Sequence, residues 1–260
     1  MSSILYQVPL LLFAVILFVL ILLVHLLGVR TGSYRRKKNP DAVAEGIGPL
    51  ETALLGLLSL LLSFTFSMSA SRYDSRRAAI VAEANDISTA VLNADLYPDS
   101  IRTGLRKDLE QYVDERILYY QYNNEKEANA SLIKAQAIHF EIWKKIAALS
   151  HDPSNTVRSY HMVPALHDMA AAANSRDALR KARVPYSIIW LLIILALLGS
   201  FIIGYAKKQR KNDWIILFIY AVMMVITLFT ILDLDRSRSG LIKTEGTHLK
   251  IDELKDMFKE

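Results

Sequence analysis

The sequence predicts an all-α, polytopic membrane protein with four transmembrane helices and a helical extramembrane region between the second and the third. The chain is 52% hydrophobic and 22% charged, and the two kinds of residue occupy separate stretches. Four windows are apolar over roughly 20 residues, the length of helix that crosses a bilayer core of about 30 Å. The polar stretch after the second window has apolar residues at three- and four-residue spacing, which indicates amphipathic helices.

The four apolar windows predict four membrane-spanning helices. They are residues 8–29, 49–70, 186–206 and 214–234. The first window has no basic residue before it and no small-residue cleavage site after it, so we interpret it as a retained transmembrane helix rather than a secretory signal. The chain then divides into transmembrane helices 1 and 2 in 1–71, an extramembrane region in 72–184, transmembrane helices 3 and 4 in 185–235, and a charged C-terminal tail in 236–260.

The extramembrane region is predicted to be helical throughout. Its first part continues the second membrane helix to Ala94, because no helix breaker comes before Pro98, and Ser100 fits the N-cap of the next helix. That helix has apolar residues at helical spacing from Ile101 to Tyr120. A turn at Asn123 and Asn124, a helix over 128–149, a capping turn at Asp152-Pro153-Ser154 and a fourth helix ending at Arg183 complete the region.

The second membrane helix carries the most informative pattern. Serines recur at every fourth position, and an apolar set lies beside them: Ser59, Ser63, Ser67 and Ser71, with Leu58, Leu62 and Phe66. Residues four apart on a helix lie nearly above one another, so the hydroxyls form a stripe that must face protein or water. The stripe either lines a narrow conduit with the apolar set as a constriction, or joins Gly56 in letting two helices approach closely. The sequence leaves both interpretations open.

Charged residues mark both ends of this helix. Glu51 is expected in the first turn, close to Pro49, where it either caps the helix or adds a carboxylate to a pore mouth. The other end carries a charged group formed by Arg72, Asp74, Arg76 and Arg77. This exit group either anchors the helix at the membrane interface, concentrates anions at a pore mouth, or pairs with Glu83 and Asp86.

Asp233 and Asp235 follow the fourth membrane helix and invite comparison with a calcium loop. An EF-hand loop counted from Asp233 needs glycine at its sixth position and glutamate at its twelfth, where this chain has Arg238 and Thr244. We therefore expect an interfacial turn in which the two aspartates pair with Arg236 and Arg238.

Nothing in the sequence supports catalysis. The chain has no cysteine, and His161 and His167 are six residues apart, which places them on different faces of a helix. It has no phosphate-binding glycine loop, nucleophile elbow or dinucleotide fingerprint. We predict no enzymatic activity, no catalytic residue, no metal and no cofactor. The net charge of +5 comes from clusters beside the membrane, which argues against a nucleic-acid partner.

The charge of the loops leaves the orientation open. The short loops after the first and third membrane helices are basic, at 35–38 and 207–211, and the positive-inside rule places such loops in the cytoplasm. Basic residues also flank the opposite ends of the membrane helices, among them Arg72, Arg183 and Arg236. The total bias therefore nearly cancels.

Residues 54–85 resemble the pore helix of bestrophins, and more closely that of bestrophin-like membrane proteins of bacteria and plants. Their sequence is LLGLLSLLLSFTFSMSASRYDSRRAAIVAEAN. The shared features are the start at Glu51, Phe-Thr-Phe at 64–66, Arg-Tyr-Asp at 72–74, Glu-Ala-Asn at 83–85, and the Asp-x-Asp-Arg and Ser-Gly segment at 233–240. The central helices match in layout only.

The resemblance implies an oligomeric ion channel, pentameric by analogy, whose second helices surround the pore. It implies an anion such as chloride as the permeant ion, inorganic ions and the lipid bilayer as partners, and the cell (inner) membrane as the location. The resemblance assigns an apolar neck of the pore to Leu58, Leu62 and Phe66. It also implies that the central helices are cytosolic, which conflicts with the orientation that the basic short loops indicate. The arginines at 236 and 238 replace the calcium clasp of true bestrophins. The rival hypothesis is a non-conducting scaffold or signalling protein that binds a partner through its central helices.

Overall fold

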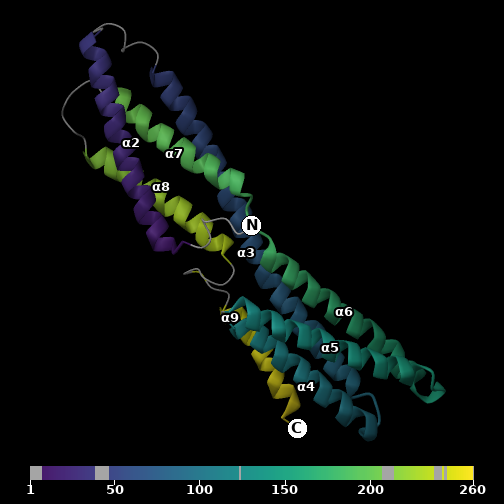
Figure 1. The fold of residues 1–260 in the computed structure, drawn as a ribbon. Coiled ribbons are helices and arrows are strands. Elements are labelled where there is room, and N and C mark those ends of the chain that lie inside the picture. The colour runs from purple at the N-terminus through teal and green to yellow at the C-terminus, as the bar shows by residue number, and fades with distance from the viewer. Residues whose placement is uncertain are drawn as a thin grey trace. The chain divides into compact units, whose positions relative to one another are not determined.

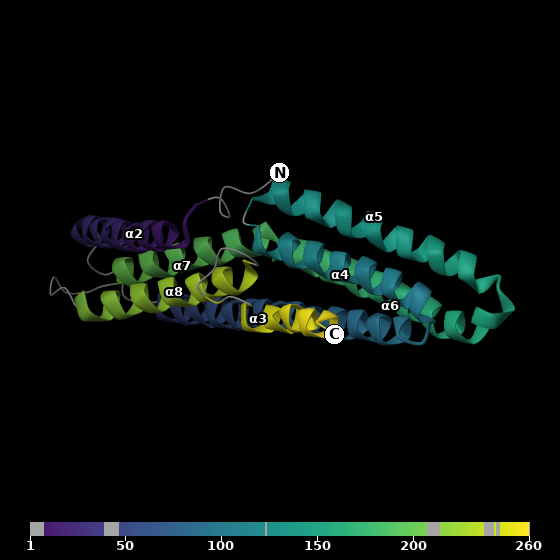
Figure 2. The same ribbon diagram turned by 90° about the horizontal axis from the view of Figure 1, so that it is seen from below.

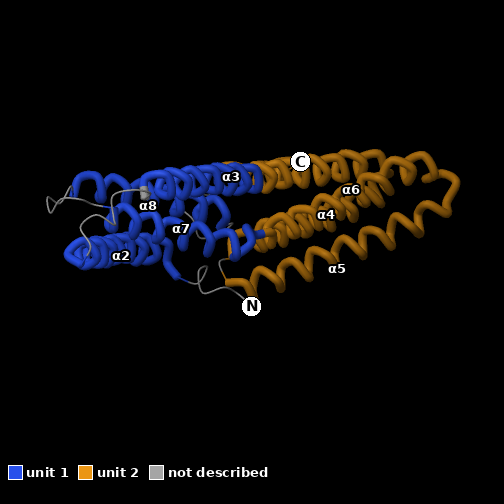
Figure 3. Tube along the Cα trace, turned by 90° about the horizontal axis from the view of Figure 1, so that it is seen from above, with its two compact units in different colours: residues 1–73, 183–242 blue, residues 74–182, 243–260 orange. Residues whose placement is uncertain are grey.

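The computed structural model describes residues 8–38, 47–122, 124–206, 214–236, 242 and 245–259. Every regular element in these ranges is a helix, so the predicted all-α fold is confirmed. Four of the described helices are long and apolar enough to cross a membrane. The chain forms two compact units, residues 1–73 with 183–242 and residues 74–182 with 243–260, which Figure 3 colours separately.

Unit 1 holds the membrane helices. They are α2 (Leu10–Lys38), the first part of α3 (Ile47–Ala94), α7 (Tyr186–Ala206) and α8 (Trp214–Asp235). α2 packs along α7 and also contacts α8, as Figure 1 shows. Its core is apolar and includes Ile21 of α2, Ile189 of α7 and Leu228 of α8. Large apolar side chains such as Leu11 and Ile215 are exposed, as expected of helices whose outer faces contact lipid.

Small residues allow α2 and α7 to approach each other closely. A Cβ atom added to Gly28 would collide with the backbone of α7, and one added to Gly204 would collide with the carbonyl of His25. The hydroxyl of Ser200 donates a hydrogen bond to the carbonyl oxygen of Ile21 at 2.8 Å. The side chain of His25 is buried against α7. Such contacts are typical of membrane helices, where packing and hydrogen bonds replace the hydrophobic effect.

Unit 2 is a helical bundle outside the predicted spans. It contains the rest of α3, α4 (Asp99–Gln121), α5 (Glu125–Ser150), the 3-10 helix η1 (Pro153–Asn155), α6 (Thr156–Lys181), α9 (Glu245–Asp252) and the 3-10 helix η2 (Glu253–Phe258). α5 contacts both α4 and α6 (Figure 2). The apolar stripe of α4 enters the core through Leu105, Leu109 and Val113. Ile251 and Leu254 join the same core, so part of the charged tail belongs to the bundle.

Polar side chains cap two of the bundle helices. The Asn124 side chain accepts a hydrogen bond from the backbone N–H of Lys126 at 3.0 Å, at the start of α5. Asp152 accepts one from the N–H of Ser154 at 2.9 Å, which confirms the predicted capping turn before α6. Both bonds satisfy N–H groups that have no partner inside their helix.

Several predicted ends of the bundle helices are wrong by one to three residues, and the largest difference is at α5, which begins at Glu125 rather than at Ala128. α4 begins at Asp99 and has no side-chain cap, because the carbonyl of Pro98 already accepts the first helical N–H groups; Ser100 therefore lies inside the helix. α6 ends at Lys181 rather than at Arg183. The chain leaves the helical conformation before Pro185, as expected of residues that approach a proline.

Candidate functional site

The serine stripe of α3 lies on an exposed face of unit 1. Ser59, Ser63 and Ser67 are all exposed. A Cβ atom added to Gly56, on the same face, would meet nothing within 4 Å. A face with hydroxyl groups along a membrane segment is favourable only against protein or water. The stripe is therefore a candidate surface for assembly around an aqueous path.

Leu58 and Leu62 lie beside the serine stripe and are turned toward the core. They are 1% and 7% exposed and belong to the apolar core that α3 forms with α2, α7 and α8. Each residue on a helix is turned about 100° from the one before it, so a serine next to a buried leucine emerges outside. The expectation that the two leucines share an exposed neck with Phe66 is wrong for this protomer. Phe66 alone of the three is outside the core, with 43% of its surface exposed.

Close packing through the serine stripe does not occur between the described helices of this chain. Within unit 1, the closest helix approach is made by the glycines between α2 and α7, where added Cβ atoms would collide with backbone. Gly56 and the neighbouring serines have no such neighbour among the described residues. Within one chain, this face is therefore left exposed.

Glu51 lies deeper in α3 than predicted. The helix begins at Ile47, and its first turn contains no acidic residue. Only the first four N–H groups of a helix lack an internal partner, and Glu51 comes after them. The prediction of a carboxylate in the first turn is therefore wrong, and its interaction with the helix dipole is weaker there. The Glu51 side chain is half-buried.

The exit group of four charged residues is distributed over both units. Arg72 closes the unit 1 part of α3 and is half-buried. In unit 2, Asp74 and Arg77 are exposed and Arg76 is buried. The Nε group of Arg77 donates a hydrogen bond to the hydroxyl of Thr247 at 3.3 Å, which connects α3 to α9.

Glu83 is the centre of a buried ion cluster in unit 2. Its carboxylate accepts hydrogen bonds from Nε of Arg116 and, at 2.5 Å, from Nη1 of Arg176. Nη2 of Arg176 also lies 3.1 Å from Nδ1 of His248. Burial raises the pKa of Glu83, but the two guanidinium groups outweigh it and hold that pKa below its ordinary value of 4.5. The arginines that bind Glu83 come from α4 and α6, and its pairing with the exit group stays a prediction.

This ion cluster was not predicted from the sequence, although one signal of it was present. Arg116 lies seven residues after Leu109 and three after Val113, so it falls on the apolar stripe of α4. A charged residue on such a stripe is buried and needs a partner of opposite charge. Its side chain is in fact fully buried against Glu83. The partner itself was not predictable, because it lies on another helix.

Asp233 and Asp235 are buried and bind backbone groups. The carboxylate of Asp235 accepts a hydrogen bond from the N–H of Val184 at 3.1 Å. Oδ2 of Asp233 accepts one from the N–H of Ile242 at 2.8 Å. The post-membrane acidic segment therefore binds the chain just before α7 begins and shortly after α8 ends.

The two arginines expected to pair with these aspartates have different outcomes. Nη2 of Arg236 donates a hydrogen bond to the backbone carbonyl of Val8 at 2.8 Å. Arg238 lies outside the described residues. Among the residues that the structure does describe, no group of three histidine, aspartate or glutamate side chains is placed to hold a metal ion.

A protein-family model described as a Bestrophin-like domain matches residues 13–247. The chain belongs to the Bestrophin-like family. The match covers both membrane helix pairs and the whole bundle between them, which confirms the resemblance seen at residues 54–85.

Solved structures have the same fold as this Bestrophin-like chain. A crystal structure of a bacterial Bestrophin homolog from Klebsiella pneumoniae is 14% identical, with a TM-score of 0.69, and the alignment covers 95% of this chain and 98% of that one. A variant of that homolog is 13% identical with a TM-score of 0.69, over 100% of both chains. At this identity the similarity shows the fold. No curated protein sequence matches the chain.

Proposed function

We propose that this Bestrophin-like protein is a homo-oligomeric ion channel, pentameric by family analogy, in the cell (inner) membrane. The membrane part of α3 lines the pore with Ser59, Ser63 and Ser67, and Phe66 contributes the apolar constriction. The permeant ion is an anion such as chloride. The proposal rests on the family and on one observation, the exposed serine face of α3.

The orientation of α3 supports this role. Its apolar face is used inside the protomer, where Leu58 and Leu62 join the core with the other membrane helices. Its polar face is exposed along the same segment. If several copies are arranged around an axis, the serine faces of all copies line one water-filled pore. Hydroxyl groups suit either sign of ion, so they do not decide the selectivity.

The charges at the ends of α3 support anion selectivity. Arg72 and Arg77 lie beyond the membrane segment together with Arg76, and only Asp74 opposes them there. A mouth with excess positive charge raises the local concentration of anions. Glu51 lies near the other end of the same segment and opposes this preference.

Recordings from the purified protein in planar bilayers test the pore. Phe66→Ala is compared with Phe64→Ala, because both phenylalanines are exposed on α3 but point about 160° apart around its axis. We expect Phe66→Ala to change the single-channel conductance several-fold and Phe64→Ala to leave it near the wild-type value. Equal effects of the two variants would contradict the assigned pore face.

Reversal potentials in asymmetric chloride salt test the selectivity. We expect the wild type to reverse toward the chloride equilibrium potential, and Arg77→Gln to move the reversal toward that of the cation. Glu51→Gln is expected to move it the other way. A cation-selective wild type would contradict the choice of anion while leaving the pore in place.

A second candidate function is a non-conducting scaffold or signalling protein. One observation favours it: unit 2 exposes large side chains that a solvated bundle does not need, including Ile133, Phe140, Val157 and Tyr160. Folded, oligomeric protein that carries no current with either Phe66 or Ala at position 66 would favour this candidate over the channel.

A further inference from the structure

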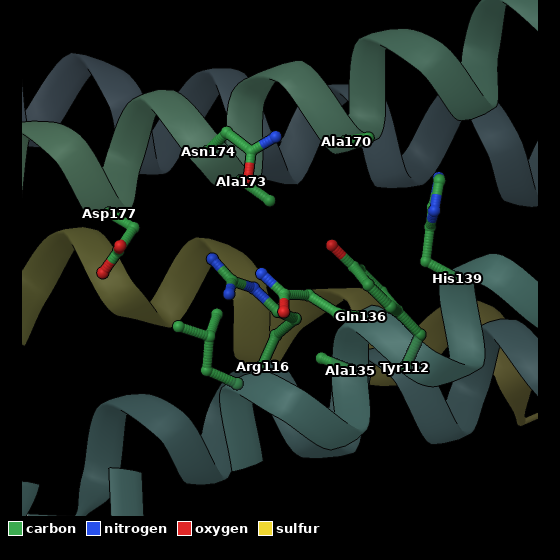
Figure 4. Close-up of a pocket in the computed structure, with 10 residues that line it drawn as sticks. Tyr112, Arg116, Ala135, Gln136, His139, Ala170, Ala173, Asn174 and Asp177 are labelled. Atoms are coloured by element: carbon green, nitrogen blue, oxygen red, sulfur yellow. The ribbon is translucent and has the colours of Figure 1, made fainter. Parts of the chain in front are cut away.

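Unit 2 contains a cavity between α4, α5 and α6 that the pore does not use. Its volume is about 190 Å³. The polar side chains around it are those of Tyr112, Arg116, Gln136, His139, Asn174 and Asp177. Figure 4 shows the guanidinium group of Arg116, the Gln136 amide and the Tyr112 hydroxyl in this space, with Asn174 opposite. The cavity lies entirely within one unit.

Arg116 presents an unused end to the cavity. Its Nε group is bonded to Glu83, but Nη1 and Nη2 have no hydrogen-bond partner among the described residues. The side chain is completely buried. A buried polar group without a partner costs roughly 1–3 kcal/mol, and more if it is charged. Arg116 belongs to the wall of the cavity, so a ligand that reached Nη1 and Nη2 would remove this penalty.

The charge around Arg116 favours an anion. Glu83 carries one negative charge and is shared by Arg116 and Arg176. Asp177, the carboxylate that lines the cavity, already has partners: it accepts hydrogen bonds from Tyr119, Arg180 and Lys181. Asp177 is therefore neutralised by cations outside the cavity wall, and Arg116 and Arg176 share the single negative charge of Glu83, which leaves an excess of positive charge at Arg116. A negatively charged ligand would balance it.

Neutral donors complete the set. The amide groups of Gln136 and Asn174 and the hydroxyl of Tyr112 border the same space. Burial raises the pKa of Tyr112, so its hydroxyl stays protonated and able to donate. His139 is oriented by a 2.9 Å bond between its Nε2 and the carbonyl of Leu166, in which Nε2 donates.

The volume of the cavity and its apolar lining indicate which class of anion fits it. A volume of about 190 Å³ is many times the roughly 10–15 Å³ that one water molecule needs by the same measure, so the cavity has room for more than one halide ion. The two terminal nitrogens of a guanidinium group form a planar fork that matches the two oxygens of a carboxylate. The rest of the wall is apolar, from Leu132, Ala135, Ala170 and Ala173. We propose that this cavity binds a small aliphatic carboxylate, with its two oxygens on Arg116 and its carbon chain against the leucine and the alanines.

Binding at this site would act on the bundle rather than on the permeation path. The ligand would join α4 to α5 and α6 at a place where the protein alone leaves donors without partners. The proposal does not require that the protein conducts ions, so a silent channel would leave it standing.

The test uses the full chain in detergent with sodium propionate as the probe, against sodium chloride at the same ionic strength. A ligand that binds only the folded state raises the midpoint of thermal unfolding, and we expect a rise of about 3–6 °C at a propionate concentration about ten times Kd. Isothermal titration calorimetry gives the affinity. Sodium sulfate in place of propionate tests whether an inorganic oxyanion is preferred.

The variants avoid Arg116, whose loss would leave Glu83 with a single arginine. Gln136→Ala and Asn174→Ala each remove one exposed donor and should weaken propionate binding about fivefold, the effect of one neutral hydrogen bond. Ala173→Leu fills the cavity and should abolish binding. Gln111→Ala, an exposed glutamine of α4 outside the cavity, is the matched control and should bind as the wild type does.

Three results would overturn the proposal. Propionate that stabilises no more than chloride does would show that the cavity takes no carboxylate. Sulfate that binds where propionate does not would replace the carboxylate by an inorganic oxyanion. Propionate binding that survives Ala173→Leu would place the site elsewhere on the protein.

Discussion

The two halves of α3 bury different chemistry. In unit 1 the helix turns apolar side chains such as Leu58 inward, and its buried Thr65 hydroxyl donates to the carbonyl of Leu61 in its own backbone at 2.7 Å. In unit 2 the same helix buries Glu83 between two arginines. Polar groups that remain outside in unit 1 are uncharged serines, whereas unit 2 keeps a full charge inside.

The difference follows from the partners available to each half of α3. A charge inside a bilayer is costly, so a membrane segment satisfies its polar groups locally or turns them toward protein and water. A bundle outside the membrane has other helices that supply the opposite charge, here α4 and α6. The unit 1 half of α3 should therefore be sensitive to shape and its unit 2 half to charge.

The largest effect is expected from Glu83→Ala. It leaves Arg116 and Arg176 buried without their anion, which should lower the free energy of unfolding by about 3–5 kcal/mol. Thermal unfolding followed by circular dichroism measures it. The control is Glu141→Ala, which removes an exposed pair with Lys144 and should cost less than about 1 kcal/mol. Equal losses would mean that burial of the charge is unimportant.

The corresponding test of unit 1 is a change of shape. Gly28→Ala places a methyl group against the backbone of α7 and should cost about 1–3 kcal/mol. Gly56→Ala, with open space at the same atom, should stabilise the helix by about 0.5–1 kcal/mol. Unfolding in a denaturing detergent compares the two. A neutral Gly28→Ala would show that α2 and α7 are not closely packed.

Low pH should lower the stability of unit 2 through protonation of Glu83. The pKa of Glu83 is lowered in the folded protein, so its contribution is fully present above the ordinary value of 4.5 and is lost as pH falls through the folded pKa. The loss approaches about 1.4 kcal/mol for each pH unit. We expect unit 2 to lose stability below pH 4.5, and Glu83→Gln to remove this part of the pH dependence. The measurement is the melting temperature of both proteins from pH 7 to pH 3.

The smallest effect is expected from Ser200→Ala in unit 1. It removes the hydrogen bond to the carbonyl of Ile21 and should cost about 0.6 kcal/mol, the average for such bonds between membrane helices. A loss above 2 kcal/mol would show that unit 1 depends on polar contacts as strongly as unit 2 does.

Local patterns were predictable from the sequence. The span 186–206 agrees with α7 exactly, and the continuation of the second membrane helix to Ala94 agrees with the end of α3. The sequence also showed that serines form one stripe on that helix, because spacing along a helix needs only local information. Ser100 is not the cap because α4 already starts at Asp99. Helix starts one or two residues apart fit the local sequence almost equally well, so the sequence does not decide between them.

The amino-acid sequence alone determined the helices, the four membrane spans, the family, and the relation between neighbouring stripes on α3. Only the tertiary structure decided that Leu58 lies inside and Ser59 outside, because the buried side of a helix depends on which helices surround it. It alone joined Glu83 to arginines 33 and 93 residues away. The apolar pattern of a helix repeats every 3.6 residues and can be recognised within a single segment. An ion pair or a cavity forms only when segments that are distant in the sequence pack together.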